Sequence, residues 1–547
     1  MSNNGKHGRD RNGYRNDKDH GGRNDRDDHK EEKEGRGNSD GHEGRPGKPG
    51  KMSKHGAMLR GDNPPNSRYY DQGRFGRLFP SLEPFAADTP TIRAALMKMG
   101  EPGGIIDAQD DPNATPVDLI VNPALNVNNP NNPNLSAGMT FLGQFVDHDI
   151  TLDTTSSLEQ QVDPEAIRNF RTPTLALDNI YGEGPANNAH LYDATDPVKL
   201  LVEPIPGSAA QSRGGAQRFD LPRNSQGTAL IGDVRSDENL ILSQMHLAFL
   251  MFHNKCVDHV RANTALTSPN AIFLEAQRLV RWHYQWILVH EFLPKTCGQA
   301  VVDDVLNNGR KYYKWRNEPF IPVEFSVAAY RFGHTQVRPS YRMNFGPAAG
   351  GDIFLRIFVD NAANAASPDP DDLRGGLRQP RRFIDWQTFF DFGDGNVRPN
   401  KKIDTRLSSA LMNLIGFPAN EPQSLAQRNL LRHLTFKLPS GQAVAKAMRL
   451  PVLPPGDLSD LAVHGLDTRT PLWFYVLREA EKTQNGERLG AVGARIVTEV
   501  FIGLMEGDGT SYLKLDRTWK PSLPSTAGPG NFSIADLLRF AGVVHPL

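Results

Sequence analysis

The sequence has few cysteines, no long apolar run and almost no net charge. Its 547 residues include two cysteines, Cys256 and Cys297, which excludes a disulfide-stapled scaffold and a zinc or iron–sulfur site built from cysteines alone. The formal net charge is −1, so no overall field attracts nucleic acid or an anionic membrane. The most apolar run, Leu240 to Phe252, is well short of the roughly 20 residues that span a bilayer, and we expect no integral membrane segment.

The first 55 residues differ in composition from the rest of the chain. They are rich in Gly, Asn, Asp, His, Lys and Arg and have almost no apolar residues, so burial cannot offset the entropy lost on ordering. We predict a disordered polar tail over residues 1–55, without the apolar stretch of a signal peptide, and one globular domain over residues 56–547. A cytoplasmic location, or secretion without a classical signal peptide, is the corresponding expectation.

Apolar residues recur at helical spacing in four segments of the globular part: Leu240 to Val260, Ala271 to Phe292, Ala491 to Met505 and Leu537 to Val544. Residues 236–238 are expected to begin the first of these helices, and the second should end before Pro294. The Asn/Pro-rich stretches 122–133 and 360–373 are predicted as surface loops. The predicted fold class is mainly α, a single large helical domain with long irregular loops and little β structure.

The first polar cluster with chemical potential lies in residues 141–149, which read FLGQFVDHD. On a helix, Gln144 and His148 stand at i and i+4 on one face. Asp147 borders that face, whereas Asp149 points away from it by about a hundred degrees. Taken alone, this cluster is more typical of a partly buried polar helix end than of a catalytic site.

Two further clusters occur later in the chain. Arg235 and Glu238 are three residues apart immediately before the helix expected from Leu240, and alone they fit a helix cap. Residues 329–335 read AYRFGHT, so that His334 follows a glycine and Arg331 precedes it by three positions. An isolated His334 is more typical of a satisfied core histidine than of a metal ligand, and only the joint occurrence of the clusters points to a function.

Together the clusters resemble the animal-type haem peroxidases of the peroxidase–cyclooxygenase superfamily, in a bacterial-type member. The matching pieces are Gly143-Gln144-x-x-Asp147-His148-Asp149 for the distal motif, Gly232-Asp-x-Arg235-Ser-x-Glu238 for the arginine segment, Arg331-Phe-Gly-His334-Thr335 for the proximal motif, and Asn429-Leu-Leu-Arg432 for the segment that orients the proximal histidine. The resemblance extends from about residue 80 to the C-terminus. It implies a haem b enzyme that reduces hydrogen peroxide and oxidises a small-molecule electron donor.

The resemblance also implies a role for each matched residue. His334 is expected to be the proximal ligand of the haem iron, with Asn429 accepting a hydrogen bond from its other nitrogen. His148 is expected to take a proton from the peroxide and return it to the departing oxygen. Arg235 would stabilise the charge that develops on that oxygen, and Gln144 would hold a distal water or an entering halide.

Two carboxylates match positions that form ester bonds to haem methyl groups in relatives. These residues are Asp147 and Glu238, so the resemblance implies covalently attached haem, with free hydrogen-bonded carboxylates as the alternative. Asn239 stands where some mammalian members have a methionine, which excludes a sulfonium link. Arg331 suits an ion pair with a haem propionate.

A Ca²⁺ site is matched less completely. Asp149, Thr172, the carbonyl of Thr174 and Asp178 correspond to calcium ligands of the family, and oxygen atoms are the ligands that Ca²⁺ prefers. The central acid of the family's loop is replaced here by Ala176. Because one carboxylate fewer should weaken the site, the sequence leaves calcium binding open.

Other functions compete with a peroxidase that oxidises halides or small aromatic donors. A fatty-acid dioxygenase of the same superfamily carries a tyrosine three residues before the proximal histidine. Here that position is Arg331, and Tyr330 would be turned about a hundred degrees around a helix. A haem-free structural or adhesion protein would keep the motifs only as structure. A hydrolase using His246 and His253 lacks an acid at metal-ligand spacing. No pattern specifies the oligomeric state.

Overall fold

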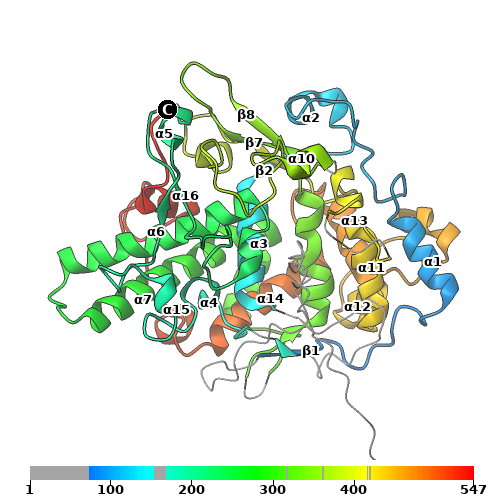
Figure 1. Ribbon diagram of the computed structural model, residues 1–547. Coiled ribbons are helices and arrows are strands. Elements are labelled where there is room, and N and C mark those ends of the chain that lie inside the picture. Colours follow the sequence, from blue (N-terminus) through cyan, green and yellow to red (C-terminus); the bar gives the residue numbers. More distant parts are fainter. Residues whose placement is uncertain are drawn as a thin grey trace, which may run out of the picture. The chain divides into compact units, whose positions relative to one another are not determined.

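The computed structural model describes residues 73–152, 168–169, 171–315, 318–359, 362–415, 417 and 420–547. The predicted tail over residues 1–55 lies outside the described residues. The prediction of a mainly helical fold with little β structure is confirmed, and Figure 1 shows many helices with β2, β7 and β8 at the top of the view and β1 at the bottom.

The α-helices supply most of the framework. Their bounds are α1 Pro90–Met99, α2 Asp118–Val121, α3 Gly138–Ile150, α4 Asp178–Tyr181, α5 Ser208–Gln211, α6 Leu240–Asn263, α7 Pro269–Ile287, α8 Leu293–Cys297, α9 Gln299–Asn308, α10 Ala362–Ala366, α11 Leu425–Thr435, α12 Gly441–Ala447, α13 Leu472–Gln484, α14 Ala491–Gly507, α15 Tyr512–Leu515 and α16 Ile534–Ala541.

Shorter helical turns and strands connect these helices. The 3₁₀ turns are η1 Pro123–Leu125, η3 Ala189–Leu191, η4 Val234–Asp237, η7 Ala329–Gln336, η8 Trp386–Thr388, η9 Ser409–Met412 and η10 Pro455–His464, and two turns, η5 Leu288–Phe292 and η6 Glu324–Ala328, are π-helical. The strands are β1 Gly73–Gly76, β2 Asn131–Ser136, β3 Arg168–Asn169, β4 Glu203–Pro204, β5 Phe219–Asp220, β6 Ile321–Pro322, β7 Ser340–Asn344, β8 Ile353–Arg356 and β9 Pro399–Lys401.

Helix α6 begins at Leu240, as the sequence predicted, but without the expected first turn. Residues 236–238 do not form its first turn, because the chain from Val234 to Asp237 is the separate 3₁₀ turn η4. The N-cap is Asn239, whose side chain accepts a hydrogen bond from the backbone N–H of Leu242 at 2.9 Å. Such a cap satisfies one of the unpaired N–H groups at a helix start. Only Glu238 and Asn239 thus separate the 3₁₀ turn η4 from helix α6.

Helix α7 itself ends at Ile287, but the helical run continues past Pro294, where the sequence predicted an end. It passes into the π turn η5 and then into α8, where Pro294 stands in the first turn. Proline is tolerated there because a first-turn N–H has no partner within the helix. The π turn inserts an extra residue into the helical ladder, and it ends at Phe292, whose side chain lines the main cavity described below.

The two stretches predicted as surface loops are more ordered than expected. Residues 122–133 contain η1 and the start of β2, which pairs antiparallel with β9. Residues 362–366 form α10, and Asp372 and Leu373 are fully buried. Both stretches are held by contacts with distant parts of the chain, which local composition does not reveal.

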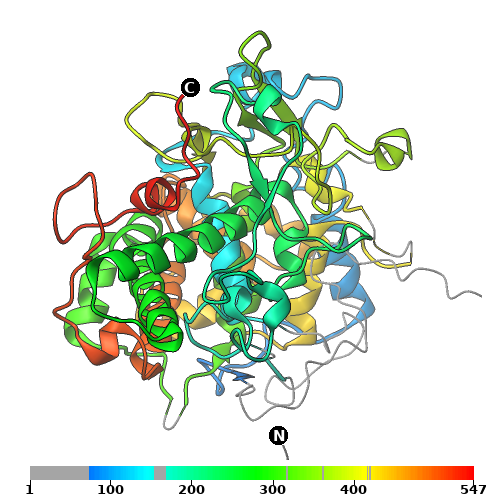
Figure 2. The ribbon, with the colours of Figure 1, turned by 60° about the vertical axis from the view of Figure 1, so that its left-hand side comes forward.

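The core packs around α3. This helix contacts α6 on one side, and it also contacts η7. Figure 1 shows α6 and α7 together on one side of α3 and α11, α12 and α13 on the other. Figure 2 shows α6 and α7 as adjacent helices joined by a short connection. The elements that carry the candidate residues are thus buried among helices.

Strand β1 joins the strand beside the end of α3 to the strand that precedes η6 and η7. It pairs antiparallel with β3 and parallel with β6. In β3, the buried side chain of Asn169 accepts a hydrogen bond from Leu152 N and donates one to Ile150 O, each at 2.8 Å. Asn169 therefore holds the C-terminal end of α3, while β6 leads directly into η6 and η7.

Candidate active site

One cavity brings together every residue that the sequence assigned to catalysis or haem binding. Its lining includes Gln144, Asp147, His148, Arg235, Glu238, Arg331, His334 and Asn429. We call the lining residues from α3, from η4 and from Glu238 and Asn239 the distal wall. The lining residues from η7 and α11 form the proximal wall. The rest of the lining is largely apolar and includes Phe75, Met139, Phe141, Phe292, Val327, Phe332, Ile357, Phe358, Leu411 and Leu425.

The distal wall places His148 on α3, as the i, i+4 spacing predicted. Its side chain is 4% exposed, and its Nδ1 lies 3.5 Å from the hydroxyl of Ser236. Burial, followed by the positive charge of Arg235, lowers the pKa of His148 to about 4. The imidazole is therefore neutral near pH 7 and has a lone pair that can accept a proton.

Arg235 belongs to the same wall, and hydrogen bonds on the side away from the cavity fix its guanidinium. Its Nε and Nη2 donate to the two carboxylate oxygens of Asp233 at 3.1 and 2.7 Å. Nη2 also donates to the carbonyl oxygens of His148, at 3.3 Å, and of Thr151. The guanidinium is thus bonded both to its own segment and to the end of α3.

The two carboxylates expected to bind haem covalently also line the cavity. Asp147 accepts a hydrogen bond from the Thr151 hydroxyl at 3.1 Å. Glu238 accepts a close hydrogen bond from the side-chain amide of Gln144. Gln144, for which we expected contact with a distal water or halide, therefore has its amide N–H directed at Glu238 in this structure.

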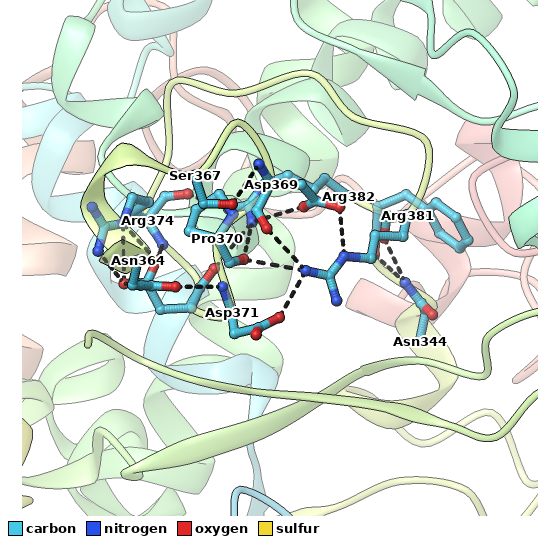
Figure 3. A network of polar contacts seen from close by, with 11 residues as sticks. Asn344, Asn364, Ser367, Asp369, Pro370, Asp371, Arg374, Arg381 and Arg382 are labelled. Atoms are coloured by element: carbon cyan, nitrogen blue, oxygen red, sulfur yellow. Dashed lines mark hydrogen bonds and ion pairs between the residues drawn. The ribbon is translucent and has the colours of Figure 1, made fainter. Parts of the chain in front are cut away.

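A loop braces Glu238 from outside the cavity. The N–H of Gly375 donates to the Glu238 carbonyl at 3.0 Å, and a Cβ at Gly375 would lie 1.7 Å from the carbonyl oxygen of Asp237. The neighbouring Arg374 forms an ion pair with the buried Asp372 at 2.6 Å. Figure 3 shows how Arg381 and Arg382 continue this polar network across the loop. Only glycine fits at position 375, because the backbone of the loop there contacts the backbone of the arginine segment.

The proximal wall places His334 against the fully buried Asn429. Their facing atoms, His334 Nδ1 and Asn429 Nδ2, are 2.8 Å apart. The predicted contact is present, but the amide nitrogen faces the imidazole because Asn429 Oδ1 accepts from Arg331 Nη1 at 3.1 Å. An imidazole that binds iron through Nε2 carries its proton on Nδ1 and needs an acceptor there. Rotation of the amide by 180° would supply this acceptor.

His334 lies on a 3₁₀ helix rather than on an α-helix. The preceding π turn η6 leads straight into η7, and Tyr330, Arg331 and His334 all line the cavity. Tyr330 therefore lines the cavity, although a 3₁₀ helix rotates it by about 120° from Arg331. Its hydroxyl donates to the Gly143 carbonyl at 3.0 Å, which ties the proximal segment to α3.

Three of the residues assigned to calcium, Asp149, Thr172 and Asp178, lie close together behind α3. Asp149 accepts hydrogen bonds from the N–H of Asp178 at 3.0 Å and from the Tyr284 hydroxyl at 3.3 Å. The side chain of Thr172 bonds to Asp178. Burial raises the pKa of both carboxyls, and that of Asp149 is raised further by the charge of Asp178. Among the described residues, no group of three or more His, Cys, Asp or Glu side chains forms a metal cluster.

His246, His253 and both cysteines are buried in the helical core. His253 bonds to the Tyr181 hydroxyl at 3.1 Å and to the Val198 carbonyl at 2.9 Å. His246 packs with Phe145, with ring centroids 6.2 Å apart. Cys256 and Cys297 are both buried and free. These contacts give the hydrolase alternative no support.

The part of the chain that the structure describes contains no helix with the length and apolar character needed to cross a bilayer.

Comparisons with known proteins show which family the chain resembles. The family model described as animal haem peroxidase matches residues 156–353, which include Arg235 and His334. The chain is 25% identical over 382 residues to the peroxidasin homolog pxn-2 of Caenorhabditis elegans, covering 65% of this chain and 27% of that protein. Peroxidase A of Dictyostelium discoideum shares the fold with a TM-score of 0.50 at 16% identity, over 84% of this chain and 92% of that one.

The chain is similar to the animal haem peroxidases over residues 156–353. It spans about a quarter of the length of the curated relatives that it matches. The same fold also occurs in a fatty acid alpha-dioxygenase of Oryza sativa, with a TM-score of 0.50 at 13% identity, over 87% of this chain and 86% of that one.

The donor set in the cavity fits the haem that this family implies. His334 and His148 offer an imidazole on each wall, and neutral imidazole is a common iron ligand. The aromatic and aliphatic lining provides surface for the faces of a porphyrin. Arg331, Arg428 and Arg432 line the same cavity and can pair with carboxylates such as the haem propionates.

The motifs did not reveal Asp233 and Arg171. Both side chains are almost fully buried, and they form an ion pair at 2.6 Å next to Arg235. The only available signal was that Asp233 belongs to the Gly-Asp-x-Arg segment and that Arg171 directly precedes Thr172.

Proposed function

We propose that the chain is a haem peroxidase that reduces hydrogen peroxide and oxidises halides or small aromatic donors. The observation that carries this proposal is the meeting of His148, Arg235 and His334 in one largely apolar cavity. Haem, when bound, supplies the redox chemistry that accepts electrons from the donor and delivers them to peroxide. The side chains of the two walls supply the binding and proton-transfer steps.

The proton transfer is assigned to His148. Because its imidazole is neutral and its Nδ1 lies beside Ser236, Nε2 is the nitrogen available to the cavity. It takes the proton from one peroxide oxygen and returns it to the other, which leaves as water. Arg235 supplies a fixed positive charge beside the departing oxygen as the O–O bond breaks.

The proximal wall is assigned to cofactor binding. His334 would hold the iron, and Asn429, after rotation of its amide, would accept from Nδ1 and make the ligand more basic. Arg331 would then be released from Asn429 Oδ1 to pair with a propionate. Asp147 and Glu238 are the carboxylates proposed to form ester bonds with the haem. Acid–acetone extraction tests the esters, since quantitative release of haem would exclude them.

The decisive test is reconstitution with haem followed by addition of hydrogen peroxide. A Soret band that changes on peroxide addition, with turnover of bromide, iodide or a phenol, is expected. His148→Ala should retain the Soret band but lose rapid peroxide consumption. Equal turnover by His148→Ala would refute the role of this residue, and absence of any Soret band would favour a haem-free protein.

A dioxygenase is the second candidate because Tyr330 lines the cavity. Its hydroxyl already donates to the Gly143 carbonyl, and Arg331 occupies the position three residues before His334. Oxygen uptake with palmitate in the absence of a donor, lost in Tyr330→Phe, would support the dioxygenase instead.

We also propose that Ca²⁺ binds behind α3 through Asp149, Asp178, Thr172 and the Thr174 carbonyl. The supporting observation is that Asp149 and Asp178 are two buried carboxyls whose pKa values are raised. A divalent cation would satisfy both charges with oxygen ligands. An increase in Tm on adding Ca²⁺, absent in Asp178→Ala, is the expected result.

A further inference from the structure

We propose that Asp233 and Arg171 form a buried positioning pair that fixes the guanidinium of Arg235 and links it to the loop of residues 171–179. The inference rests on the proposed function, because it concerns the rate at which Arg235 assists peroxide reduction. Neither residue lines the cavity, so both act through Arg235 rather than on the substrate.

Asp233 determines which edge of the Arg235 guanidinium remains available. Its two oxygens accept from Nε and Nη2 of Arg235 at 3.1 and 2.7 Å, a planar bidentate arrangement that fixes orientation as well as position. Asp233 also accepts from the backbone N–H of Arg235 at 3.0 Å. Within the described part of the chain no hydrogen bond is recorded for Nη1, which leaves it as the donor for the cavity.

Arg171 holds Asp233 from the other side. Its Nη2 donates to Asp233 Oδ2 at 2.6 Å and to the Gly232 carbonyl at 2.9 Å. Asp233 is 3% exposed and Arg171 is 4% exposed. Burial opposes ionisation of Asp233, but the charges of Arg235 and Arg171 outweigh it and hold the carboxyl's pKa well below its usual value. The carboxylate is therefore shared by two guanidiniums in a dry environment.

The backbones around this pair are in close contact. A Cβ at Gly232 would lie 2.6 Å from the carbonyl oxygen of Asn179, so the arginine segment packs directly on α4. The N–H of Arg171 donates to Asn169 Oδ1 at 3.2 Å, and Asn169 holds the end of α3. Arg171 is thus fixed at its backbone to the helix of His148 and at its side chain to the segment of Arg235.

Loss of Arg171 should therefore misdirect Arg235. In Arg171→Gln, Asp233 keeps one cationic partner and can follow Arg235 instead of holding it. We expect kcat/KM for hydrogen peroxide to fall about tenfold, within the range found for residues that orient active-site ligands. Arg171→Lys keeps the charge and should recover activity to within about threefold of the parent.

A double-mutant cycle isolates the route of this effect. Arg171→Gln is compared with its parent in the wild-type background and in Arg235→Gln, always as the haem-loaded full chain. The expected result is a tenfold loss in the first background and less than a twofold loss in the second. Arg218→Gln is the matched control, since Arg218 is equally buried and forms an ion pair with Asp385 at 2.7 Å. Neither Arg218 nor Asp385 lines the cavity.

A second readout does not depend on turnover. The Kd for cyanide, measured from the Soret shift, should rise in Arg171→Gln but not in Arg218→Gln, because only the former disturbs Arg235. Both variants should lose similar unfolding free energy in urea, which controls for a purely structural effect.

The outcomes separate this inference from the proposed function. Equal losses in both backgrounds, with an active parent, would overturn the positioning role and leave the peroxidase assignment intact. A haem-loaded parent that does not respond to peroxide would overturn both.

Discussion

The two walls of the cavity differ in the kind of polar contact that builds them. On the distal wall Asp147, Arg235 and Glu238 are ionisable side chains, and behind them Asp233 forms an ion pair with Arg235. On the proximal wall the central contact joins two neutral groups, the His334 imidazole and the Asn429 amide. A wall of fixed charges suits the movement of protons and developing charge, whereas a neutral amide–imidazole pair suits the orientation of a ligand.

The largest expected effects come from removing the imidazole of one wall at a time, which should affect haem binding and peroxide reduction separately. His334→Ala should abolish stoichiometric haem binding, because the proposed iron ligand is lost. His148→Ala should bind haem fully but reduce peroxide ~10²–10⁴-fold more slowly, the usual contribution of general acid–base catalysis. Haem content per chain and stopped-flow rates with peroxide measure the two effects. If both variants lost haem to the same extent, the division between the walls would be wrong.

Removal of the distal charge should have the next largest effect. Arg235→Gln is expected to slow peroxide reduction ~10²–10³-fold, as found when a fixed donor beside developing charge is deleted. Haem affinity should change little, since Arg235 is bound by Asp233 and by the end of α3. Steady-state kinetics at saturating donor provide the measurement, and a normal rate would contradict the assigned role.

A smaller effect is expected from the proximal amide. Asn429→Leu should weaken haem binding ~10–100-fold, the usual cost of losing a partner behind a metal ligand. Asn429→Asp is the matched variant, because a carboxylate accepts from both Arg331 and the His334 Nδ1–H. Haem transfer to apomyoglobin measures the affinity, and near-identical behaviour of the two variants would show that the hydrogen bond does not matter.

The smallest effect concerns stability rather than chemistry. His433 lies behind Asn429, donates to its carbonyl at 2.9 Å and accepts from the Trp473 N–H at 3.0 Å. Burial lowers the pKa of His433 to about 4, so its contribution is complete above the unfolded value near 6.5 and is lost as the pH falls towards 4. The unfolding free energy of the wild type should fall between pH 7 and pH 5 by ~2 kcal/mol more than that of His433→Gln.

Urea titrations of both proteins at the two pH values check this prediction. Tyr181→Phe serves as a control, because it removes a buried hydrogen bond to a different histidine, His253. An unchanged pH dependence in His433→Gln would mean that this imidazole is not the titrating group.

Much of the site could be predicted from the sequence where local spacing determines geometry. The i, i+4 relation of Gln144 and His148 held because α3 is a regular helix, and Asp149 pointed away from it as expected. Spacing did not predict that Tyr330 also lines the cavity, on a segment that forms a 3₁₀ helix after a π turn. A periodicity of 3.6 does not apply to such a backbone.

Contacts between distant segments could not be predicted. Arg171 meets Asp233 across about sixty residues of chain, and the orientation of Asn429 depends on Arg331. Gly375 reaches the Asp237 carbonyl only because a loop from beyond β8 returns to the arginine segment. Such pairings depend on how helices pack, and composition alone does not encode them.

The π turn η5 has a consequence for the register of the chain. Its extra residue rotates everything after Ile287 by about a hundred degrees relative to a continuous α-helix, and Phe292 reaches the cavity in this rotated frame. Deleting one residue between Leu288 and Glu291 would restore an ordinary helix and direct a different side chain at the substrate space. The shape of that space is thus encoded partly by an insertion, which no point substitution at the cavity wall can imitate.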